Sequence, residues 1–196
     1  MRKLSCVIGV LALLLVAAFF VGGAVLPADY AVTRSVSIGA SAEEIYAAVG
    51  DLDQWSEWTA WNSESFPELE VSIPGPASGA GAIQVWKVAG RVGQLEITSA
   101  EPTRGISYTL SFEGEPPIEG IITFVGVAES TEVIWLVRGT FEGARDRWLG
   151  LTLDSQLGGQ LKEGLERLSA RFAPPPTEPS AEKDLRTGAI PPAPGG

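Results

Sequence analysis

The sequence predicts an α+β domain in which a curved antiparallel sheet of about six or seven strands wraps around a long C-terminal helix. Segments that alternate apolar and polar residues recur between residues 82 and 139, at the spacing of antiparallel strands joined by short turns. Leucines three and four positions apart then extend over residues 149–172, which is the period of one amphipathic helix. Because the sheet must cover its apolar face, and this helix is long enough to do so, we expect the sheet to curl around it.

The composition limits the chemistry that the chain can perform. Its 196 residues carry 24 acids against 14 bases, with no histidine and a single cysteine, Cys6. The missing histidines exclude Ser-His-Asp and Cys-His machinery and every His-ligated metal site, and one cysteine supports neither a disulfide within the chain nor a zinc site. The acidic balance argues against nucleic-acid binding, which depends on Lys and Arg. We therefore predict no catalytic residues, no metal and no cofactor.

The N-terminal sequence is typical of a membrane-spanning segment. Arg2 and Lys3 precede an uncharged, mostly apolar run over residues 4–26, which as a helix spans roughly 30 Å or slightly more, the thickness of the hydrocarbon layer. We predict that residues 1–28 form a retained anchor whose basic pair keeps the N-terminus cytoplasmic and the domain outside. The alternative is a cleaved signal peptide, which would leave a secreted or periplasmic protein.

The domain is expected to begin with a strand and two short helices. Residues 30–38 alternate as a strand does. Ser41 followed by Glu44 is a capping box, which opens a short helix over residues 42–50. In the next helix, Trp55, Trp58 and Leu52 share one face, and Trp61 follows it. The three tryptophans either plug the open end of the curved sheet or form a gate or membrane-touching lip.

The remaining elements complete the domain, which we place at residues 29–172. A turn-rich link over residues 74–81 separates the short helices from the strands, which we expect at residues 82–89, 94–101, 105–112, 120–127 and 132–139. The charges of residues 145–147 are read as a solvated run ahead of the helix. Gly158 and Gly159 inside that helix indicate either close approach to the sheet or room for a ligand. Residues 173–196 form a Pro-rich tail with too little apolar surface to fold.

Several blocks of this chain, in this order, resemble the SRPBCC superfamily of START, polyketide cyclase and Bet v 1-like domains. The blocks are VTRSVSIGASAEEIYAAVGDLDQWSEWTAW, GPASGAGAIQVWK, VGQLEIT, TEVIWLV and LGGQLKEGLERL. The resemblance implies the helix-grip fold, and the apolar segment before the first strand resembles a bacterial membrane-anchored subgroup. Superfamily members bind lipids, sterols, polyketides or quinones, or act as cyclases or co-chaperones, so the resemblance does not decide the function.

The expected geometry leaves a wedge between the curved sheet and the helix, which is a natural apolar pocket. Alternation along its strand places Trp135 on the face that should point toward the helix. The neighbouring strands should present similar apolar faces on the same side. The alternative is that these side chains are simply core. The predicted ligand-binding residues are Trp58, Trp61, Trp86, Tyr108, Phe124, Trp135, Leu153, Leu157 and Leu161.

The carboxylates do not form a recognisable catalytic set. Asp51 and Asp53 lie at a helix start, where they serve as caps, and Glu96 should face solvent. Asp154 lies on the long helix and could point inward. Three functions remain: a membrane-anchored domain that binds an apolar small molecule such as a lipid, an isoprenoid quinone or a polyketide-like compound; an enzyme of the polyketide cyclase or aromatase kind; and a protein-interaction module.

Overall fold

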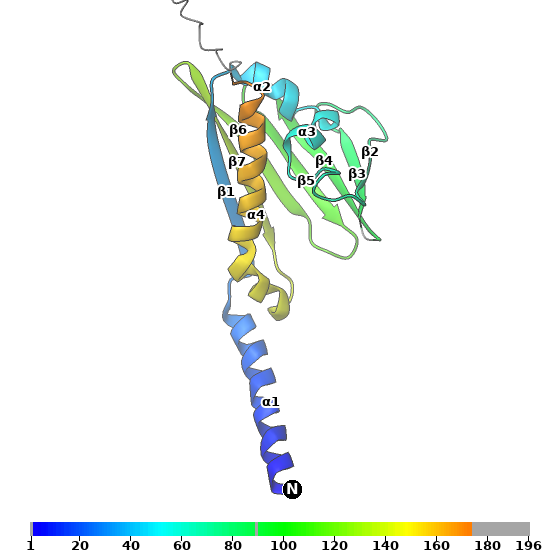
Figure 1. Cartoon of the computed structure of the whole chain (residues 1–196), viewed down its shortest axis with the longest axis vertical. Coiled ribbons are helices and arrows are strands. Elements are labelled where there is room, and N and C mark those ends of the chain that lie inside the picture. The colour runs from blue at the N-terminus through cyan, green and yellow to red at the C-terminus, as the bar shows by residue number, and fades with distance from the viewer. Residues whose placement is uncertain (1, 89, 174–196) are drawn as a thin grey trace, which may run out of the picture.

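A computed structural model describes residues 2–88 and 90–173, with side chains from residue 7 onward (Figure 1). The helices are α1 (Arg2–Val25), α2 (Ala42–Val49), the 3-10 helix η1 (Leu52–Gln54), α3 (Trp55–Trp58) and α4 (Ala144–Ala170). The strands are β1 (Asp29–Ile38), β2 (Glu70–Ser72), β3 (Ile83–Val88), β4 (Arg91–Glu101), β5 (Gly105–Phe112), β6 (Ile118–Val127) and β7 (Ser130–Thr140).

The strands form one antiparallel, seven-stranded sheet in the order β1-β7-β6-β5-β4-β3-β2. Each strand from β2 to β7 pairs with its neighbour in sequence, and β1 pairs with β7 along its whole length, from Asp29 opposite Thr140 to Ile38 opposite Thr131. The sheet curves around α4, and the short helices α2 and α3 follow the first strand (Figure 1). The predicted helix-grip architecture is confirmed.

Several bounds differ from the sequence prediction, and one strand is additional. β4 begins at Arg91 instead of residue 94, β6 begins at Ile118 instead of residue 120, and β7 covers Ser130–Thr140 instead of residues 132–139. The long helix begins at Ala144, so the charges at residues 145–147 belong to its first turn and do not precede it. The apolar period could not place this start because the first turn packs against α1, outside the domain. Strand β2 was not predicted either: its three residues are all exposed and carry no alternation, and only pairing with β3 defines it.

The predicted caps at Ser41 and Asp51 are present, whereas Asp53 lies inside η1 and is not its N-cap. Ser41 Oγ accepts a hydrogen bond from the Glu44 backbone N–H at 3.3 Å, and the Ser41 N–H donates to Glu44 Oε2 at 2.8 Å. The pKa of the Glu44 carboxyl is lowered, first by that backbone hydrogen bond and then by the Ser41 hydroxyl. Asp51 caps η1 by accepting from the Asp53 N–H at 3.2 Å.

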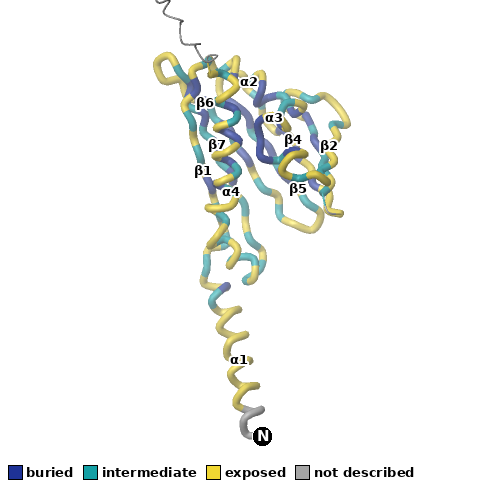
Figure 2. Tube along the Cα trace, viewed as in Figure 1, coloured by how far each residue is buried: buried dark blue, intermediate teal, exposed yellow. Residues whose placement is uncertain are grey.

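Helix α1 leaves the domain as a single exposed rod (Figure 2). Its segment Val7–Val25 is long and apolar enough to cross a membrane, and a signal sequence near the N-terminus can also meet this criterion. The predicted Pro-rich tail, residues 173–196, lies outside the described residues except for Ala173.

The strand pairing divides the domain into two halves. We call the end at which α1 meets the domain the near half. The sheet ends that belong to it are Asp29, Thr140, Ile118, Phe112, Arg91 and Val88, and α4 also starts there. The far half lies beside α2 and the C-terminal end of α4. Its core is closely packed: the side chains of Trp58, Trp135 and Leu161 are 0% exposed.

Candidate functional site

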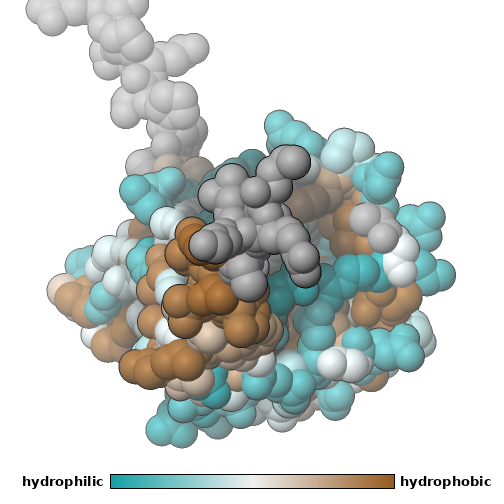
Figure 3. Space-filling view, turned by 90° about the horizontal axis from the view of Figure 1, so that it is seen from below, coloured by the Kyte–Doolittle hydropathy of each residue, from teal (hydrophilic) through white to brown (hydrophobic). Residues whose placement is uncertain are grey.

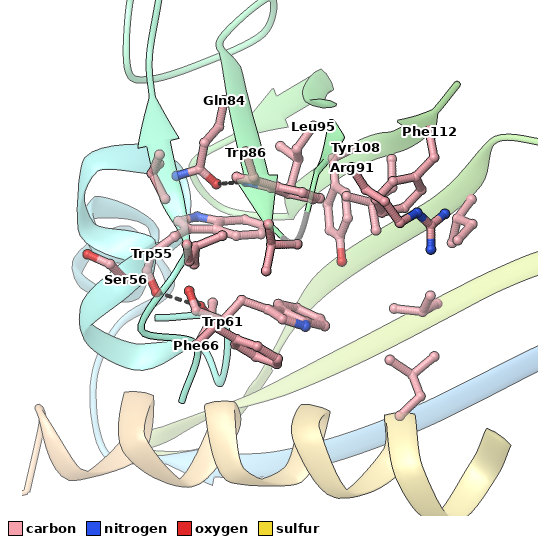
Figure 4. A pocket seen from close by; sticks show the side chains of 18 of the residues that line it. Trp55, Ser56, Trp61, Phe66, Gln84, Trp86, Arg91, Leu95, Tyr108 and Phe112 are labelled. Carbon is pink, nitrogen blue, oxygen red and sulfur yellow. Dashed lines mark hydrogen bonds between the residues drawn. The ribbon is translucent and has the colours of Figure 1, made fainter. Parts of the chain in front are cut away.

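A cavity of about 410 Å³ lies between the near half of the sheet and the first turns of α4 (Figure 4). Its lining residues are Tyr30, Trp55, Ser56, Thr59, Trp61, Phe66, Leu69, Val71, Gln84, Trp86, Val88, Arg91, Leu95, Tyr108, Leu110, Phe112, Ile118, Val137, Leu153 and Leu157. Most of these side chains are apolar or aromatic, and no carboxylate is among them. The volume lies within the range of small-molecule sites, about 300–1,000 Å³.

The floor of the cavity is made of aromatic rings that lie over glycines of the adjacent strand. Tyr108 on β5 pairs with Gly120 on β6, and a Cβ at Gly120 would overlap the tyrosine ring. Phe112 pairs with Gly93 on β4 in the same way, with the added Cβ 2.6 Å from the ring. Each ring lies down on its glycine partner and so does not extend far from the sheet into the cavity.

A third pair of this kind lies at the edge of the site. Tyr30 on β1 pairs with Gly139 on β7, and a Cβ there would lie 2.5 Å from the Tyr30 hydroxyl. Burial raises the pKa of the Tyr30 phenol, and the charge of Glu115 raises it further. This ring also packs on Phe141, with 4.8 Å between centroids. All three aromatic members of the glycine pairs line the cavity.

The wall opposite the floor comes from α4 and from the segment between α3 and β2. Leu153 and Leu157 lie one helical turn apart and are half-buried against the cavity. Trp61 and Phe66 face Trp55 and Trp86 across the space (Figure 4). The site is therefore enclosed between two layers of large apolar side chains.

The tryptophans of α3 hold this wall to the rest of the domain. Trp55 Nε1 donates to the Val49 carbonyl at 2.8 Å, and Trp58 Nε1 donates to the Ala48 carbonyl at 3.3 Å. Both side chains are buried. They act as a plug that joins α3 to α2, and the membrane-touching lip is wrong for these two side chains because neither reaches the surface. Trp55 also lines the cavity.

Tyr108 supplies a fully buried polar atom to the floor. Its hydroxyl accepts a hydrogen bond from Trp135 Nε1 at 2.8 Å, and the side chain is fully buried. Burial raises the pKa of the Tyr108 phenol far above its usual value, and the hydrogen bond from Trp135 offsets only part of that rise. The group is therefore neutral at physiological pH. Among the described residues no acceptor is recorded for its proton.

Two other polar residues of the lining, Gln84 and Thr59, already have partners. Gln84 donates to the Leu52 carbonyl at 3.2 Å and accepts from Trp86 Nε1 at 2.7 Å. The Thr59 hydroxyl donates to the Trp55 carbonyl at 2.7 Å. These bonds satisfy the polar atoms and fix the orientation of the Trp86 ring.

Arg91 lies where β3 turns into β4, at the near-half end of the cavity. It forms an ion pair with Glu115 of the β5–β6 turn, and its guanidinium lies over the Phe112 ring, 5.4 Å from the centroid. Both members of the ion pair are substantially exposed, so the pair contributes little to stability. Its position makes Arg91 the lining cation at the rim of the site.

The structure separates the nine predicted ligand residues into two groups. Five line the cavity, namely Trp61, Trp86, Tyr108, Leu153 and Leu157. The other four, Trp58, Phe124, Trp135 and Leu161, are buried in the closely packed core and are not lining residues. Trp135 lies behind the site: it donates a hydrogen bond to Tyr108 and packs edge-on against Trp55 and Trp61.

Asp154 does not point into the cavity. Its exposed carboxylate pairs with Arg34 of β1 at 3.1 Å, on the outer side of the α4–β1 contact. The same guanidinium occupies the space above Gly158, where an added Cβ would overlap it. The Arg34 side chain, and not the strand backbone, therefore fills the space at Gly158, and a Cβ at Gly159 would meet nothing within 4 Å.

Sequence reasoning missed most of the cavity wall. Phe66, Leu69 and Val71 lie in a segment with no regular period, so nothing indicated that they face inward. Tyr30 and Phe112 were missed although each pairs with a strand glycine. An aromatic residue opposite a glycine is a usable signal, but it requires the strand register.

Comparison with known proteins assigns the fold to a family. A family model described as "Polyketide cyclase / dehydrase and lipid transport" matches residues 30–173. No curated protein matches the chain.

Solved structures with this architecture are similar at low sequence identity. Protein Ms6760 from Mycobacterium smegmatis aligns with a TM-score of 0.53 and 15% identity, over 74% of this chain and 91% of its own. Protein CV1439 from Chromobacterium violaceum gives 0.51 and 14%, over 74% and 98%. The KanY protein gives 0.56 and 16%, over 74% and 97%. At such identities the likeness establishes the fold and nothing finer.

Proposed function

Since the chain belongs to the polyketide cyclase/dehydrase and lipid transport family, we propose that it binds one apolar small molecule in the near-half cavity while α1 tethers it to a membrane. The observation that carries this proposal is the cavity itself, about 410 Å³ in volume and walled by aromatic and aliphatic side chains. A tether confines such a site to the place where apolar molecules partition, which raises their effective concentration.

The ligand that fits has an apolar body and one hydrogen-bond acceptor. Tyr108 is the buried hydroxyl of the floor, and Trp135 already fills its acceptor role. The remaining proton can be donated to a carbonyl-type oxygen. A ketone, ester or quinone oxygen meets this requirement and a plain hydrocarbon does not. An ester lipid, an isoprenoid quinone and a polyketide-like molecule all belong to this class.

Binding is better supported than catalysis. General acid–base work needs a group whose pKa lies near the working pH, and the lining residues include no carboxylate. Because its pKa is raised, the Tyr108 hydroxyl keeps its proton. It can therefore donate a hydrogen bond but is a weak general acid. A cyclase would need these groups to move protons, whereas a binding protein needs only shape and one donor.

A cavity-filling variant tests the proposal. The full chain is extracted from membranes in mild detergent and examined by native mass spectrometry for a retained small molecule. Leu153→Trp places a larger side chain on the cavity wall and should remove that mass. Gln156→Trp makes the same addition on the exposed side of α4 and should leave it in place. Absence of any retained mass from the parent chain, or equal retention in Leu153→Trp, would contradict the proposal.

The role of Tyr108 has its own measurement. Affinities are compared for a medium-chain methyl ketone and for the alkane of the same length, in the parent chain and in Tyr108→Phe. Loss of one neutral hydrogen bond should weaken ketone binding by roughly tenfold and leave alkane binding nearly unchanged. Because the readout is a ratio within one variant, a general loss of stability does not imitate it. An unchanged ratio of ketone to alkane affinity would show that Tyr108 does not donate a hydrogen bond to the ketone oxygen.

A further inference from the structure

The first turns of α4 are fastened to the C-terminal part of α1. Trp148 Nε1 donates to the Phe19 carbonyl at 3.1 Å, and its ring stacks on Phe19 with 5.7 Å between centroids. Arg147 donates to the Ala24 and Leu26 carbonyls at 3.1 and 3.3 Å. The Ala24 carbonyl belongs to the last turn of α1, where no intrahelical donor remains for it, and Leu26 directly follows the helix. The domain therefore caps its own N-terminal helix.

Two glycines allow this contact. A Cβ at Gly23 would overlap the Ala144 carbonyl oxygen, and one at Gly22 would lie 2.7 Å from the Trp148 ring. Elsewhere on the same helix, a Cβ at Gly9 would meet nothing within 4 Å. Close approach thus explains Gly22 and Gly23 at the junction, and Gly9 offers a control.

The junction sets the depth of α4 relative to a bilayer that α1 crosses. Phe19 lies within the membrane-length segment Val7–Val25. It precedes the helix end at Val25 by six residues, which is about 9 Å along the axis. A side chain that stacks on Phe19 must therefore reach the membrane–water interface, where tryptophan is favoured.

An exposed apolar patch surrounds this contact. Trp148, Leu149 and Leu151 are 36%, 61% and 65% exposed, and all three lie in the first turns of α4. Seen from below, apolar side chains gather around α1 at this end of the molecule (Figure 3). The patch is continuous with the apolar surface of α1 through the Phe19–Trp148 stack.

We infer that Trp148, Leu149 and Leu151 form a second membrane contact, seated in the interface beside α1, and that this contact turns the cavity toward the bilayer. The occupant of the patch is the lipid at the boundary between headgroups and acyl chains. The patch lies on the helix that supplies Leu153 and Leu157 to the cavity, so the docked surface adjoins the site.

The position of the cavity in the domain agrees with this orientation. Its rim residues Tyr30, Val88, Arg91, Phe112 and Ile118 all lie at sheet ends of the near half, the end at which α1 enters the membrane. A ligand dissolved in the bilayer would reach the site without crossing water. This last step rests on the proposed function, whereas docking of the patch does not.

Depth-dependent quenching tests the docking. The full chain, with Cys6→Ser as background, is labelled with a fluorophore at Leu151→Cys or at Glu129→Cys, which lies on an exposed turn of the far half. It is reconstituted in vesicles of phosphatidylcholine and phosphatidylglycerol that contain a lipid with a nitroxide near the top of its acyl chain. We expect quenching at position 151 to exceed that at position 129 by several-fold.

Matched glycine variants make the test specific. Gly23→Ala should reduce quenching at position 151 at least twofold because it forces α4 away from α1, and Gly9→Ala should not change it. Equal quenching at positions 151 and 129 would overturn the inference. So would self-quenching between labels at position 151 without lipid quenching, because a second copy would then cover the patch. A quenched label on a chain that retains no small molecule would leave the docking intact and refute the proposed function alone.

Discussion

The near and far halves of the domain share one sheet and one helix, and yet only the far half is filled. In the far half, Trp58 and Trp135 extend into the space beneath α4, and Gly164 lets the helix approach to about the limit of contact, with an added Cβ 3.1 Å from Trp135. In the near half, Tyr30, Tyr108 and Phe112 lie down on strand glycines, and all three line a cavity that other side chains do not fill.

In this domain, the orientation of the aromatic side chains distinguishes the closely packed half from the half that holds the cavity. An aromatic ring opposite a residue with a Cβ has to stand away from the sheet, whereas a ring opposite glycine can lie on it. The far half supplies rigidity through closely packed contacts, and the near half keeps a cavity within walls that this rigidity supports.

The largest expected effect comes from the same truncation in the two halves. Leu161→Ala removes a fully buried side chain and should lower the free energy of unfolding by about 2–5 kcal/mol. Leu157→Ala, one turn earlier on α4, enlarges a cavity that already exists and should cost less than about 2 kcal/mol. Urea unfolding of the full chain in detergent, followed by tryptophan fluorescence, measures both. Equal losses would mean that the near half is as closely packed as the far half.

The next effect tests the glycine floor directly. Gly120→Ala should lift the Tyr108 ring into the cavity and lower the free energy of unfolding by about 1–3 kcal/mol, as overpacking does. Gly126→Ala lies on the same strand with nothing within 4 Å of the added Cβ, and it should be nearly neutral. The same unfolding assay applies, with ligand retention as a second readout. Retention that survives Gly120→Ala unchanged would show that the ring has another position outside the cavity.

The sequence was sufficient to predict the architecture because strands and helices are marked by the periodic spacing of their apolar residues. Alternation placed Val133, Trp135 and Val137 on the buried face, and the Ser41–Glu44 pair marked the start of α2. The same alternation could not separate core from cavity. Alternation predicts which face of a strand points inward, but not how far away the opposing helix lies. It therefore could not show that Trp135 is core whereas Tyr108 lines the cavity.

The missing parts of the prediction all depend on contacts between distant segments. Pairing of Gly93 with Phe112 requires the register of two strands, which the pattern of each strand alone does not fix. The first turns of α4 are held by Phe19 and Ala24 on α1, more than a hundred residues earlier in the chain. Such contacts leave no local period in the sequence.

An effect of intermediate size is expected in the pH dependence of stability, to which the buried Tyr108 phenol should make a recognisable contribution. Tyr108 keeps its proton in the folded chain above the pH at which the unfolded chain loses it, around 10.0. Its contribution to stability is therefore complete below that pH and is lost as the pH rises beyond it. The slope for one such group is about 1.4 kcal/mol per pH unit. Unfolding measured between pH 8 and about 11 should show this fall, and Tyr108→Phe should reduce its slope. An unchanged slope would mean that Tyr108 ionises in the fold.

The smallest expected effect lies at the acid end of the scale and in the far half. Hydrogen bonds from Ser41 hold the pKa of Glu44 below its ordinary value of 4.5, so the capping box is fully effective above that pH and weakens as the pH falls through the lowered pKa. Glu44→Gln can still cap through its amide but cannot titrate, so its stability should be less dependent on pH between about 3 and 5 than that of the parent chain. Glu43→Gln, in the same turn, removes the charge without removing the box and serves as the control. Because the cap closes the far half only, ligand retention should not follow this titration. If ligand retention falls over the same pH range as the stability of the cap, the two halves are coupled through α2 and are not independent.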